Sequence, residues 1–104
     1  MSKNTALTVL YCWDNQLSAL DASKNTALIH LFCYNNQLEA LDVSKNTALT
    51  TLQCQGNQLE VAALDEMFVS LHDNTGSKTI SISGNPGAST CDRTIATAKG
   101  WTVN

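Results

Sequence analysis

The four cysteines are the residues of this chain with the widest chemical repertoire. Cys12, Cys33 and Cys54 recur at a constant spacing, whereas Cys91 stands apart. Cysteines in such numbers can form disulfides or bind zinc. Three equivalent positions cannot all pair with one another, however, and side chains in a straight row do not converge tetrahedrally on a metal ion. We therefore expect three buried free thiols rather than a disulfide or a metal site, and no cofactor.

Cys91 has a different context from the other cysteines. It lies in the stretch STCDRTIATAKG, which is typical of a helix with Ser89 or Thr90 as its N-cap and Gly100 as its C-terminal stop. A thiol at a helix N-terminus can have a lowered pKa and act as a nucleophile. Packing, or a role in starting the helix, is the interpretation that we favour.

The other ionisable residues do not combine into an active site. Asp21 and Asp42 recur at equivalent positions, and two carboxylates close together can serve acid–base catalysis or calcium binding. Their shared context, LDxSKN, favours a turn in which the Asp and Ser side chains cap local amides. His30 and His72 are expected on different faces, so they supply no base for a nucleophile. We predict that the chain is not an enzyme.

Composition excludes further classes of function. A chain of 104 residues fits one domain, and a content of 43% hydrophobic and 14% charged residues suits a folded chain. The formal net charge is −3, and the six Lys and Arg residues are scattered singly, which argues against nucleic-acid binding. No apolar run reaches the roughly 18 residues of a membrane span. The start, MSKNTAL, lacks the charged and apolar regions of a signal peptide.

A constant 21-residue period organises the stretch from Ser2 to Leu59. Three copies begin at Ser2, Ser23 and Ser44 and read SKNTALTVLYCWDNQLSALDA, SKNTALIHLFCYNNQLEALDV and SKNTALTTLQCQGNQLEVAAL. Each contains the pattern L-x-x-L-x-C-x-x-N-x-L. One such repeat cannot bury its leucines alone, so neighbouring repeats must stack on one another.

This pattern resembles the leucine-rich repeat, with Cys at an inward position where Leu is usual. The connector LDVSKNTAL is similar to that of the 21-residue repeats in surface and secreted proteins of Bacteroides-type bacteria. The resemblance implies an α/β solenoid shaped as a short horseshoe arc. Each repeat would add one parallel strand to a concave sheet face, and the rest of the repeat would form an irregular convex turn. The resemblance also implies a secreted or cell-surface parent protein.

Residues 60–104 are expected to continue the solenoid with longer, helical repeats that act as a cap. The stretch VAALDEMFVSLHDNTG has apolar residues at helical spacing, and the predicted helix ends near Gly76. Ile80, Ile82 and Asn85 then occupy the Leu, Cys and Asn positions of a fourth repeat. This repeat follows the third at a spacing longer than the regular period, which leaves room for the helix.

The end of the chain predicts a fifth strand. Trp101 and Val103 follow Ile80 and Ile82 at the interval of the regular repeats, so we expect them to align with that pair. The chain 1–104 is thus predicted to form a single domain with about five parallel strands, irregular turns in the first repeats and helices in the last two.

Asparagine recurs at one position of each of the four predicted repeats, as Asn15, Asn36, Asn57 and Asn85. An inward asparagine in an irregular turn can satisfy backbone groups that would otherwise be buried without a hydrogen bond. We therefore expect these four side chains to have a structural role.

The three regular repeats differ from one another mainly on one predicted face. Side chains alternate along a strand, so Leu10 and Cys12 are expected to face the core, and Val9, Tyr11 and Trp13 to face outward. The outward positions and their edge vary, whereas SKNTAL is unchanged in the three copies. Variation on one face of a constant frame indicates that this face selects the partner. The alternative is that strand surfaces simply tolerate substitution, which accounts for Thr51, Gln53 and Gln55 but poorly for the large rings. The predicted ligand-binding residues are Val9, Tyr11, Trp13, Asp14, His30, Phe32, Tyr34, Asn35, Thr51, Gln53 and Gln55.

Four large rings are expected to gather on this face, with Tyr11 beside Phe32 and Trp13 beside Tyr34. Exposed aromatic residues are favoured anchors of protein interfaces. We therefore predict that the chain binds a protein or peptide through its concave face. One alternative is a carbohydrate-binding surface domain, because rings also stack on sugars. Another is a truncated structural solenoid that forms homodimers, through an uncapped N-terminal edge or through the aromatic face.

Overall fold

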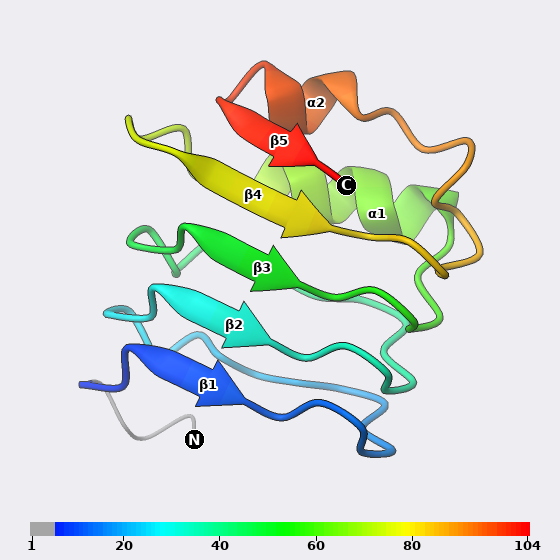
Figure 1. Ribbon diagram of the computed structural model, residues 1–104, viewed down its shortest axis with the longest axis horizontal. Coiled ribbons are helices and arrows are strands. Elements are labelled where there is room, and N and C mark those ends of the chain that lie inside the picture. The colour runs from blue at the N-terminus through cyan, green and yellow to red at the C-terminus, as the bar shows by residue number, and fades with distance from the viewer. Residues whose placement is uncertain (1–5) are drawn as a thin grey trace.

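Short parallel strands form one sheet in residues 6–104, the part of the chain that the computed structural model describes. Five strands lie side by side in sequence order (Figure 1). They are β1 (Val9–Tyr11), β2 (His30–Phe32), β3 (Thr51–Gln53), β4 (Lys78–Ser81) and β5 (Trp101–Val103). This arrangement confirms the predicted α/β architecture. The predicted start of the first repeat at Ser2 lies outside the described residues.

The three regular repeats pair in the register that their constant period predicts. Leu10 lies opposite Leu31, which lies opposite Leu52. All three side chains are buried, while the strand residues on either side of each leucine are at least partly exposed. Stacking is what buries this row of leucines, because each repeat covers the leucine of its neighbour.

The fourth strand keeps the predicted alignment, and the fifth does not. Ile80 lies opposite Leu52, the buried leucine of β3. Trp101 lies opposite Lys78, however, and Val103 opposite Ile80, so the predicted pairing of Trp101 with Ile80 was wrong. A slip of two residues preserves the alternation of faces. Trp101 therefore still points into the core, where its Nε1 donates a hydrogen bond to the carbonyl oxygen of His72 at 3.0 Å.

Two helices lie behind the sheet at the C-terminal end of the solenoid (Figure 1). Helix α1 (Val61–Ser70) takes the place of the irregular turn between β3 and β4, and helix α2 (Thr94–Thr97) precedes β5. Helix α1 buries Leu64, Met67 and Phe68, which are among the apolar residues that predicted it. The predicted helical character of the last repeats is therefore confirmed.

Helix α1 ends earlier than predicted, at Ser70 rather than near Gly76. Leu71 already has an extended backbone with ψ of 141°, so it cannot continue the helix. The ammonium group of Lys99 caps this end. It donates hydrogen bonds to the carbonyl oxygens of Phe68, Val69 and Leu71, at 3.2, 2.5 and 2.7 Å. A cation at the C-terminus of a helix also interacts favourably with the helix dipole.

Helix α2 begins later than predicted, at Thr94, so the expected N-cap at Ser89 or Thr90 was wrong. Residues 86–90 instead form turns. The backbone N–H of Thr94 donates to the Asp92 side chain at 3.1 Å, which satisfies one amide at the start of the helix. Gly100 follows the helix with φ of +88°, in agreement with its predicted role as a stop.

A row of buried asparagines joins each repeat to the one before it. Asn57 donates from Nδ2 to the carbonyl oxygens of Cys33 and Cys54, at 3.1 and 2.9 Å, and its Oδ1 accepts the N–H of Leu38 at 3.0 Å. Asn36 and Asn85 make the corresponding three contacts in their own repeats. The predicted structural role is confirmed for these three residues. Asn15, also predicted to point inward, is exposed and donates only to the nearby carbonyl oxygens of Cys12 and Trp13.

A second asparagine row lies in the convex turns and was not predicted. Asn25 and Asn46 are fully buried. Asn46 donates from Nδ2 to the carbonyl oxygens of Ala22 and Asn25, at 3.0 and 2.9 Å, so it bonds to the preceding turn. The unchanged Asn of SKNTAL was the available signal for this row. It explains in part why the turn sequence is constant.

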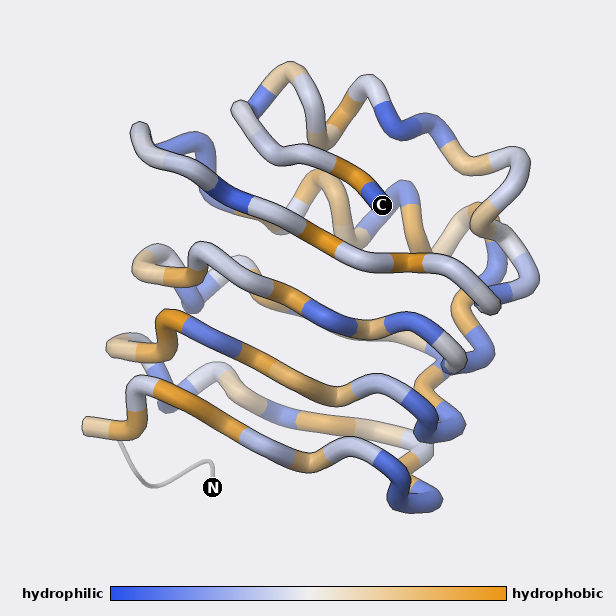
Figure 2. Tube along the Cα trace, in the orientation of Figure 1, coloured by the Kyte–Doolittle hydropathy of each residue, from blue (hydrophilic) through white to orange (hydrophobic). Residues whose placement is uncertain are grey.

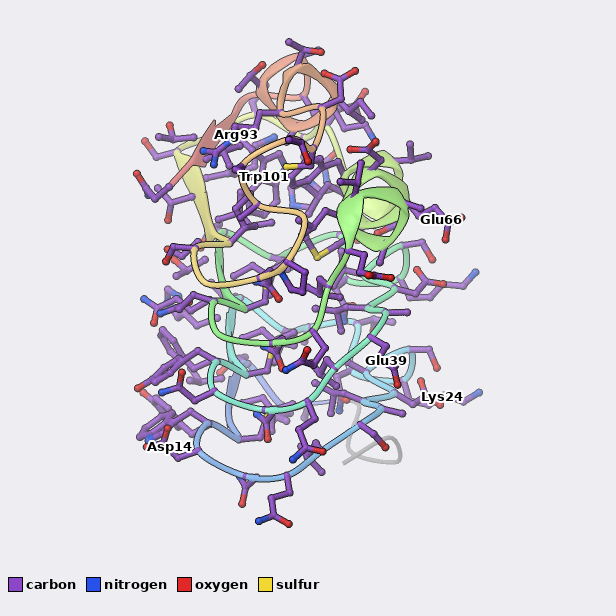
Figure 3. The ribbon with its side chains drawn as sticks, turned by 90° about the vertical axis from the view of Figure 1, so that its right-hand side faces the viewer. Asp14, Lys24, Glu39, Glu66, Arg93 and Trp101 are labelled. Carbon is purple, nitrogen blue, oxygen red and sulfur yellow. The ribbon has the colours of Figure 1, made fainter. Side chains whose placement is uncertain are left out.

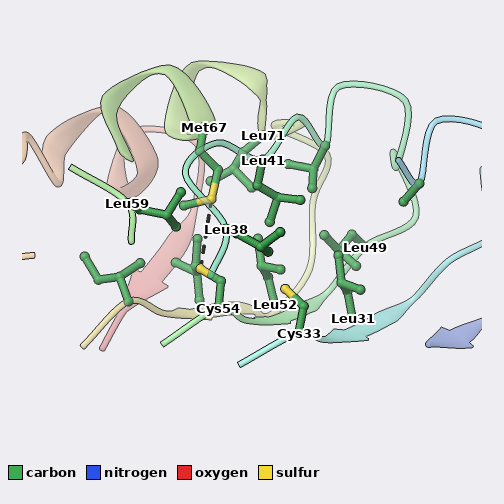
Figure 4. Packing of buried hydrophobic residues seen from close by; sticks show 14 of the residues in the cluster. Leu31, Cys33, Leu38, Leu41, Leu49, Leu52, Cys54, Leu59, Met67 and Leu71 are labelled. Atoms are coloured by element: carbon green, nitrogen blue, oxygen red, sulfur yellow. Dashed lines mark hydrogen bonds between the residues drawn. The ribbon is translucent and has the colours of Figure 1, made fainter. Parts of the chain in front are cut away.

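The cysteines of the repeats pack inside the core as predicted. Cys12, Cys33 and Cys54 are buried free thiols. Figure 4 shows Cys33 and Cys54 among leucines from the strands and the turns, with Cys54 Sγ 4.0 Å from Met67 Sδ. The trace in Figure 2 shows hydrophobic and hydrophilic residues mixed along the strands, as expected when one side of the sheet is core and the other is exposed.

Candidate functional site

The face of the sheet that points away from the core, called here the outer face, carries the predicted binding residues in rows. Val9 lies opposite His30, and His30 opposite Thr51. Tyr11, Phe32 and Gln53 form the next row in the same way. None of the eleven predicted residues is buried. Their placement on one surface is as predicted, and their role in binding stays a prediction.

Four rings on the outer face, Tyr11, Trp13, Phe32 and Tyr34, form one aromatic cluster. Tyr11 and Phe32 stack with ring centroids 5.1 Å apart and planes within 9°. Trp13 and Tyr34 stack at 5.5 Å and within 2°. The two stacks meet edge to face, since Tyr11 and Trp13 are 5.1 Å apart at 86°. Parallel strands at repeat spacing produce this geometry, because they hold equivalent side chains one strand apart.

The aromatic cluster is ordered by its own contacts but is not covered by the rest of the described chain. Tyr11 is 63% exposed and Trp13 is 38% exposed. Phe32 and Tyr34 are half-buried, with Phe32 also 6.1 Å from the parallel ring of His30. Contiguous exposed rings mark interaction sites in soluble proteins more often than they serve the fold.

One edge of the outer face is built from residues with left-handed backbone. Asp14 and Asn35 have φ of 55° and 57°, and Gly56 follows in the same position with φ of 71°. Asn35 donates from Nδ2 to Asp14 Oδ1 at 2.9 Å. A Cβ atom at Gly56 would lie 2.4 Å from Asn35 Oδ1, at the end of a side chain that can move, so the positive φ is the firmer reason for glycine at this position. The sequence signal for this edge was Asp, Asn and Gly at equivalent positions, because these residue types tolerate positive φ.

Two polar atoms on the outer face are covered without a hydrogen-bond partner among residues 6–104. They are His30 Nδ1 and Gln55 Oε1. A covered polar group without a partner costs about 1–3 kcal/mol of stability.

The outer face changes character along the sheet. The aromatic cluster occupies β1 and β2 and the residues just after them. The equivalent positions further along are polar, since Thr51 lies opposite Thr79, and Gln53 opposite Ser81. Thr102 of β5 continues the row of threonines. The surface thus has an aromatic half and a hydroxyl- and amide-bearing half.

Charged residues are scarce among the predicted binding residues. Figure 3 shows Asp14 on the side of the sheet, and Lys24, Glu39 and Glu66 on the opposite side of the molecule. Asp14 is the only Asp or Glu among the eleven predicted binding residues, and none of the eleven is Lys or Arg. The surface is therefore aromatic and polar with a single carboxylate at its edge.

The paired aspartates have the predicted turn role. Asp21 and Asp42 each accept a backbone N–H, from Ser23 at 2.9 Å and from Ser44 at 2.8 Å. Hydrogen bonds from these serines lower the pKa of both carboxyl groups. Within residues 6–104 no three His, Cys, Asp or Glu side chains gather closely enough to hold a metal ion.

The surroundings of the thiols favour their protonated form. Burial raises the pKa of the Cys12 and Cys33 thiols, and that of the Cys54 thiol to about 12. Cys91 is half-buried, and burial raises its pKa also, so the suggestion of a lowered pKa at this position was wrong. The physical reason is that Cys91 precedes the start of α2 at Thr94 and does not occupy its first turn.

Stacked parallel strands with a repeated inward Leu and Asn define a solenoid repeat protein. The family model described as leucine rich repeats (2 copies) matches residues 5–46, and the same strand and asparagine geometry continues through β4. The chain thus contains leucine-rich repeats, matched over residues 5–46. A comparison with curated proteins gave no match.

Membership of this class bears on function in general terms. Leucine-rich repeat domains generally mediate protein–protein interactions and are typically not catalytic. Among the helices in residues 6–104, none has the length and apolar character needed to cross a membrane.

Proposed function

We propose that this chain is a protein- or peptide-binding module whose binding surface is the outer face of the sheet. The observation that carries the proposal is the aromatic cluster. Its four rings are exposed or half-buried, yet they are held in fixed stacks at positions where the repeats differ. Rings that are already ordered lose little conformational entropy on binding, which favours their use as anchors.

The contrast between frame and face supports the same proposal. Buried Asn46 and Asn57 hold the repeats together through backbone carbonyls, and their sequence positions are constant. The rings stack on one another on the outer face, and the third repeat keeps the same frame with Gln53 and Gln55 at the positions of Phe32 and Tyr34, so the frame does not require rings there. Large exposed rings are unfavourable for solubility unless a partner covers them.

The stacks leave at most one flat face of each ring free for a carbohydrate, whereas protein side chains can also pack against the ring edges. Stacking on a sugar uses the flat face of a ring. In the aromatic cluster, each of Tyr11, Phe32, Trp13 and Tyr34 already has one face against its stacked partner. Interdigitation with apolar side chains of a protein needs no free ring face.

The location of the parent protein belongs to the same proposal. The connector LDVSKNTAL is similar to that of repeats in secreted and surface proteins of Bacteroides-type bacteria. A binding module without catalytic groups suits the outside of a cell, where recognition of other proteins is a common task.

The proposal is tested with a phage-displayed library of random dodecapeptides selected on the immobilised chain. Dissociation constants of the selected synthetic peptides are then measured by fluorescence anisotropy. Trp13→Ala and Tyr34→Ala should each weaken binding at least about tenfold, in line with aromatic anchors at other interfaces. Val69→Ala is the matched control, because Val69 is 63% exposed on α1 and lies off the outer face.

Circular dichroism should show that the three variants keep the fold. Selected peptides that bind Trp13→Ala and Tyr34→Ala as tightly as the unmodified chain would overturn the proposal. A glycan array run in parallel would reveal sugar binding, and light scattering over a range of concentrations would reveal self-association.

A further inference from the structure

We infer that the partner segment carries an arginine or lysine side chain, which lies along the aromatic cluster and pairs with Asp14. The inference rests on the proposed function and specifies the chemistry of the partner. Long basic side chains are suited to such a site, because their methylene stems pack on apolar surface while the charged head meets an acid.

The position of Asp14 is the first support for this inference. It follows Trp13 directly, at the edge of the outer face and beside the aromatic cluster. Its side chain is exposed, and Oδ1 accepts a hydrogen bond from Asn35 at 2.9 Å. That bond orients the carboxylate without neutralising it, since an amide carries no charge. A carboxylate fixed in this way is prepared to accept a cationic donor.

The distribution of the cations is the second support. Lys78 and Lys99 donate to backbone carbonyls near α1, and Lys24 lies on the side of the molecule opposite the sheet (Figure 3). No Lys or Arg in residues 6–104 forms an ion pair with Asp14. A partner that covered the aromatic cluster would also bury the neighbouring Asp14 carboxylate, and a buried charge without a partner is energetically costly. A partner that brings its own positive charge avoids that cost.

The same requirement argues against the outer face of a second copy of this chain as the occupant. The outer face has no Lys or Arg among its eleven proposed binding residues, so two such faces in contact would bring two carboxylates and no strongly basic group. Opposite charges across an interface favour specific partners, and like charges exclude wrong ones. A peptide segment with a basic residue and neighbouring apolar residues would both pair with Asp14 and cover the aromatic cluster.

The test uses the peptides selected from the dodecapeptide library. They should be enriched in Arg or Lys next to apolar residues. One arginine-containing peptide is then resynthesised with citrulline, which has nearly the same shape but no charge. We expect the citrulline peptide to bind the unmodified chain about threefold to tenfold more weakly. Asp14→Asn should remove this difference. Asparagine tolerates the left-handed backbone, as Asn35 does at the equivalent position of the next repeat.

The outcomes separate this inference from the proposed function. Suppose that the peptides lose affinity for Trp13→Ala, but that the unmodified chain and the Asp14→Asn variant show the same arginine-to-citrulline ratio. That result would overturn the inference and leave the proposed function standing, and so would selected peptides without Arg or Lys. Peptides unaffected by Trp13→Ala, or a library that yields no binder, would overturn both. Raising the salt concentration should shrink the arginine-to-citrulline ratio, because exposed charges are screened.

Discussion

The ammonium nitrogen of Lys78 lies 5.6 Å from the centroid of the Trp101 ring, and both side chains are buried. Lys78 Nζ also donates hydrogen bonds to the carbonyl oxygens of Asn74 and Lys99. Trp101 Nε1 donates to the carbonyl oxygen of His72. This pair therefore fastens β4 and β5 to the loop that follows α1. The carbonyl oxygens and the ring take the place of the carboxylate with which a buried lysine is usually paired.

Replacing Lys78 with methionine should lower the free energy of unfolding by about 2–3 kcal/mol, because two carbonyl oxygens lose their donor. Urea denaturation followed by circular dichroism measures this loss. Lys24→Met is the control, since Lys24 is exposed on the convex side, and it should change stability by less than about 0.5 kcal/mol. Equal effects of the two substitutions would show that the Lys78 contacts do not stabilise the last repeats.

Asn57→Ala should destabilise the chain by about 3 kcal/mol or more. The substitution leaves the carbonyl oxygens of Cys33 and Cys54 and the N–H of Leu38 without this partner in the core. Asn15→Ala removes the equivalent residue at an exposed position and should cost much less. A comparison of the two by urea denaturation checks the expectation, which fails if Asn15→Ala is the more damaging change.

The stacked pair Tyr11 and Phe32 should be energetically coupled. Stacked aromatic pairs contribute about 0.5–1.5 kcal/mol beyond the burial of their surface. A double-mutant cycle with Tyr11→Ala and Phe32→Ala should therefore give a coupling energy in that range. The pair Tyr11 and Thr79, on strands that are not neighbours, serves as the reference cycle. A coupling energy near zero for the stacked pair would mean that the rings do not order each other.

Alkaline pH should weaken the fold through the buried thiols. The pKa of Cys54 rises from 9.0 to about 12 on folding, so between these values the unfolded chain has lost the thiol proton and the native chain retains it. The free energy of unfolding then falls as pH rises, by up to about 1.4 kcal/mol per pH unit for each such thiol. This stability is fully present below pH 9.

Urea denaturation under reducing conditions at pH 8 and pH 10.5 measures this dependence. The Cys54→Ala variant lacks the group, so its stability should fall by about 2 kcal/mol less over the same interval. The comparison uses the pH dependence and not the absolute stability, since removal of the side chain also leaves a cavity. Identical pH dependence in the two proteins would contradict the burial of this thiol.

The register of the first three strands follows from the sequence because it rests on identity between repeats. Leu10, Leu31 and Leu52 occur at one spacing, and parallel stacking converts that spacing into spatial adjacency. The ring pairs of the aromatic cluster follow for the same reason. Their centroid distances and angles do not, because these depend on side-chain rotamers that neighbouring rings select together.

Features at the C-terminal end were harder to predict because no repeat constrains them. The alignment of β5 was wrong by two residues, since Trp101 could be placed inward in either register. Lys78 lies two residues before Ile80, so the alternation of the strand places it on the inward side. A charged residue is not expected there from the sequence, because the backbone carbonyls that accept its hydrogen bonds can be identified only in the structure. The end of α1 is also capped by a residue distant in the sequence, Lys99.

Strand β1 has a neighbour on one side among the described residues, and that neighbour is β2. The aromatic cluster spans these two strands, so a partner bound to it would contact the first two repeats and hold them together. Local unfolding of this repeat would then be less frequent when a partner is bound to the outer face. Amide hydrogens between the strands, such as the Cys12 N–H that donates to the carbonyl oxygen of Phe32, would exchange with solvent more slowly in the complex. Binding of a partner at this end of the solenoid would thus be measurable as slower hydrogen exchange of the backbone amides between β1 and β2.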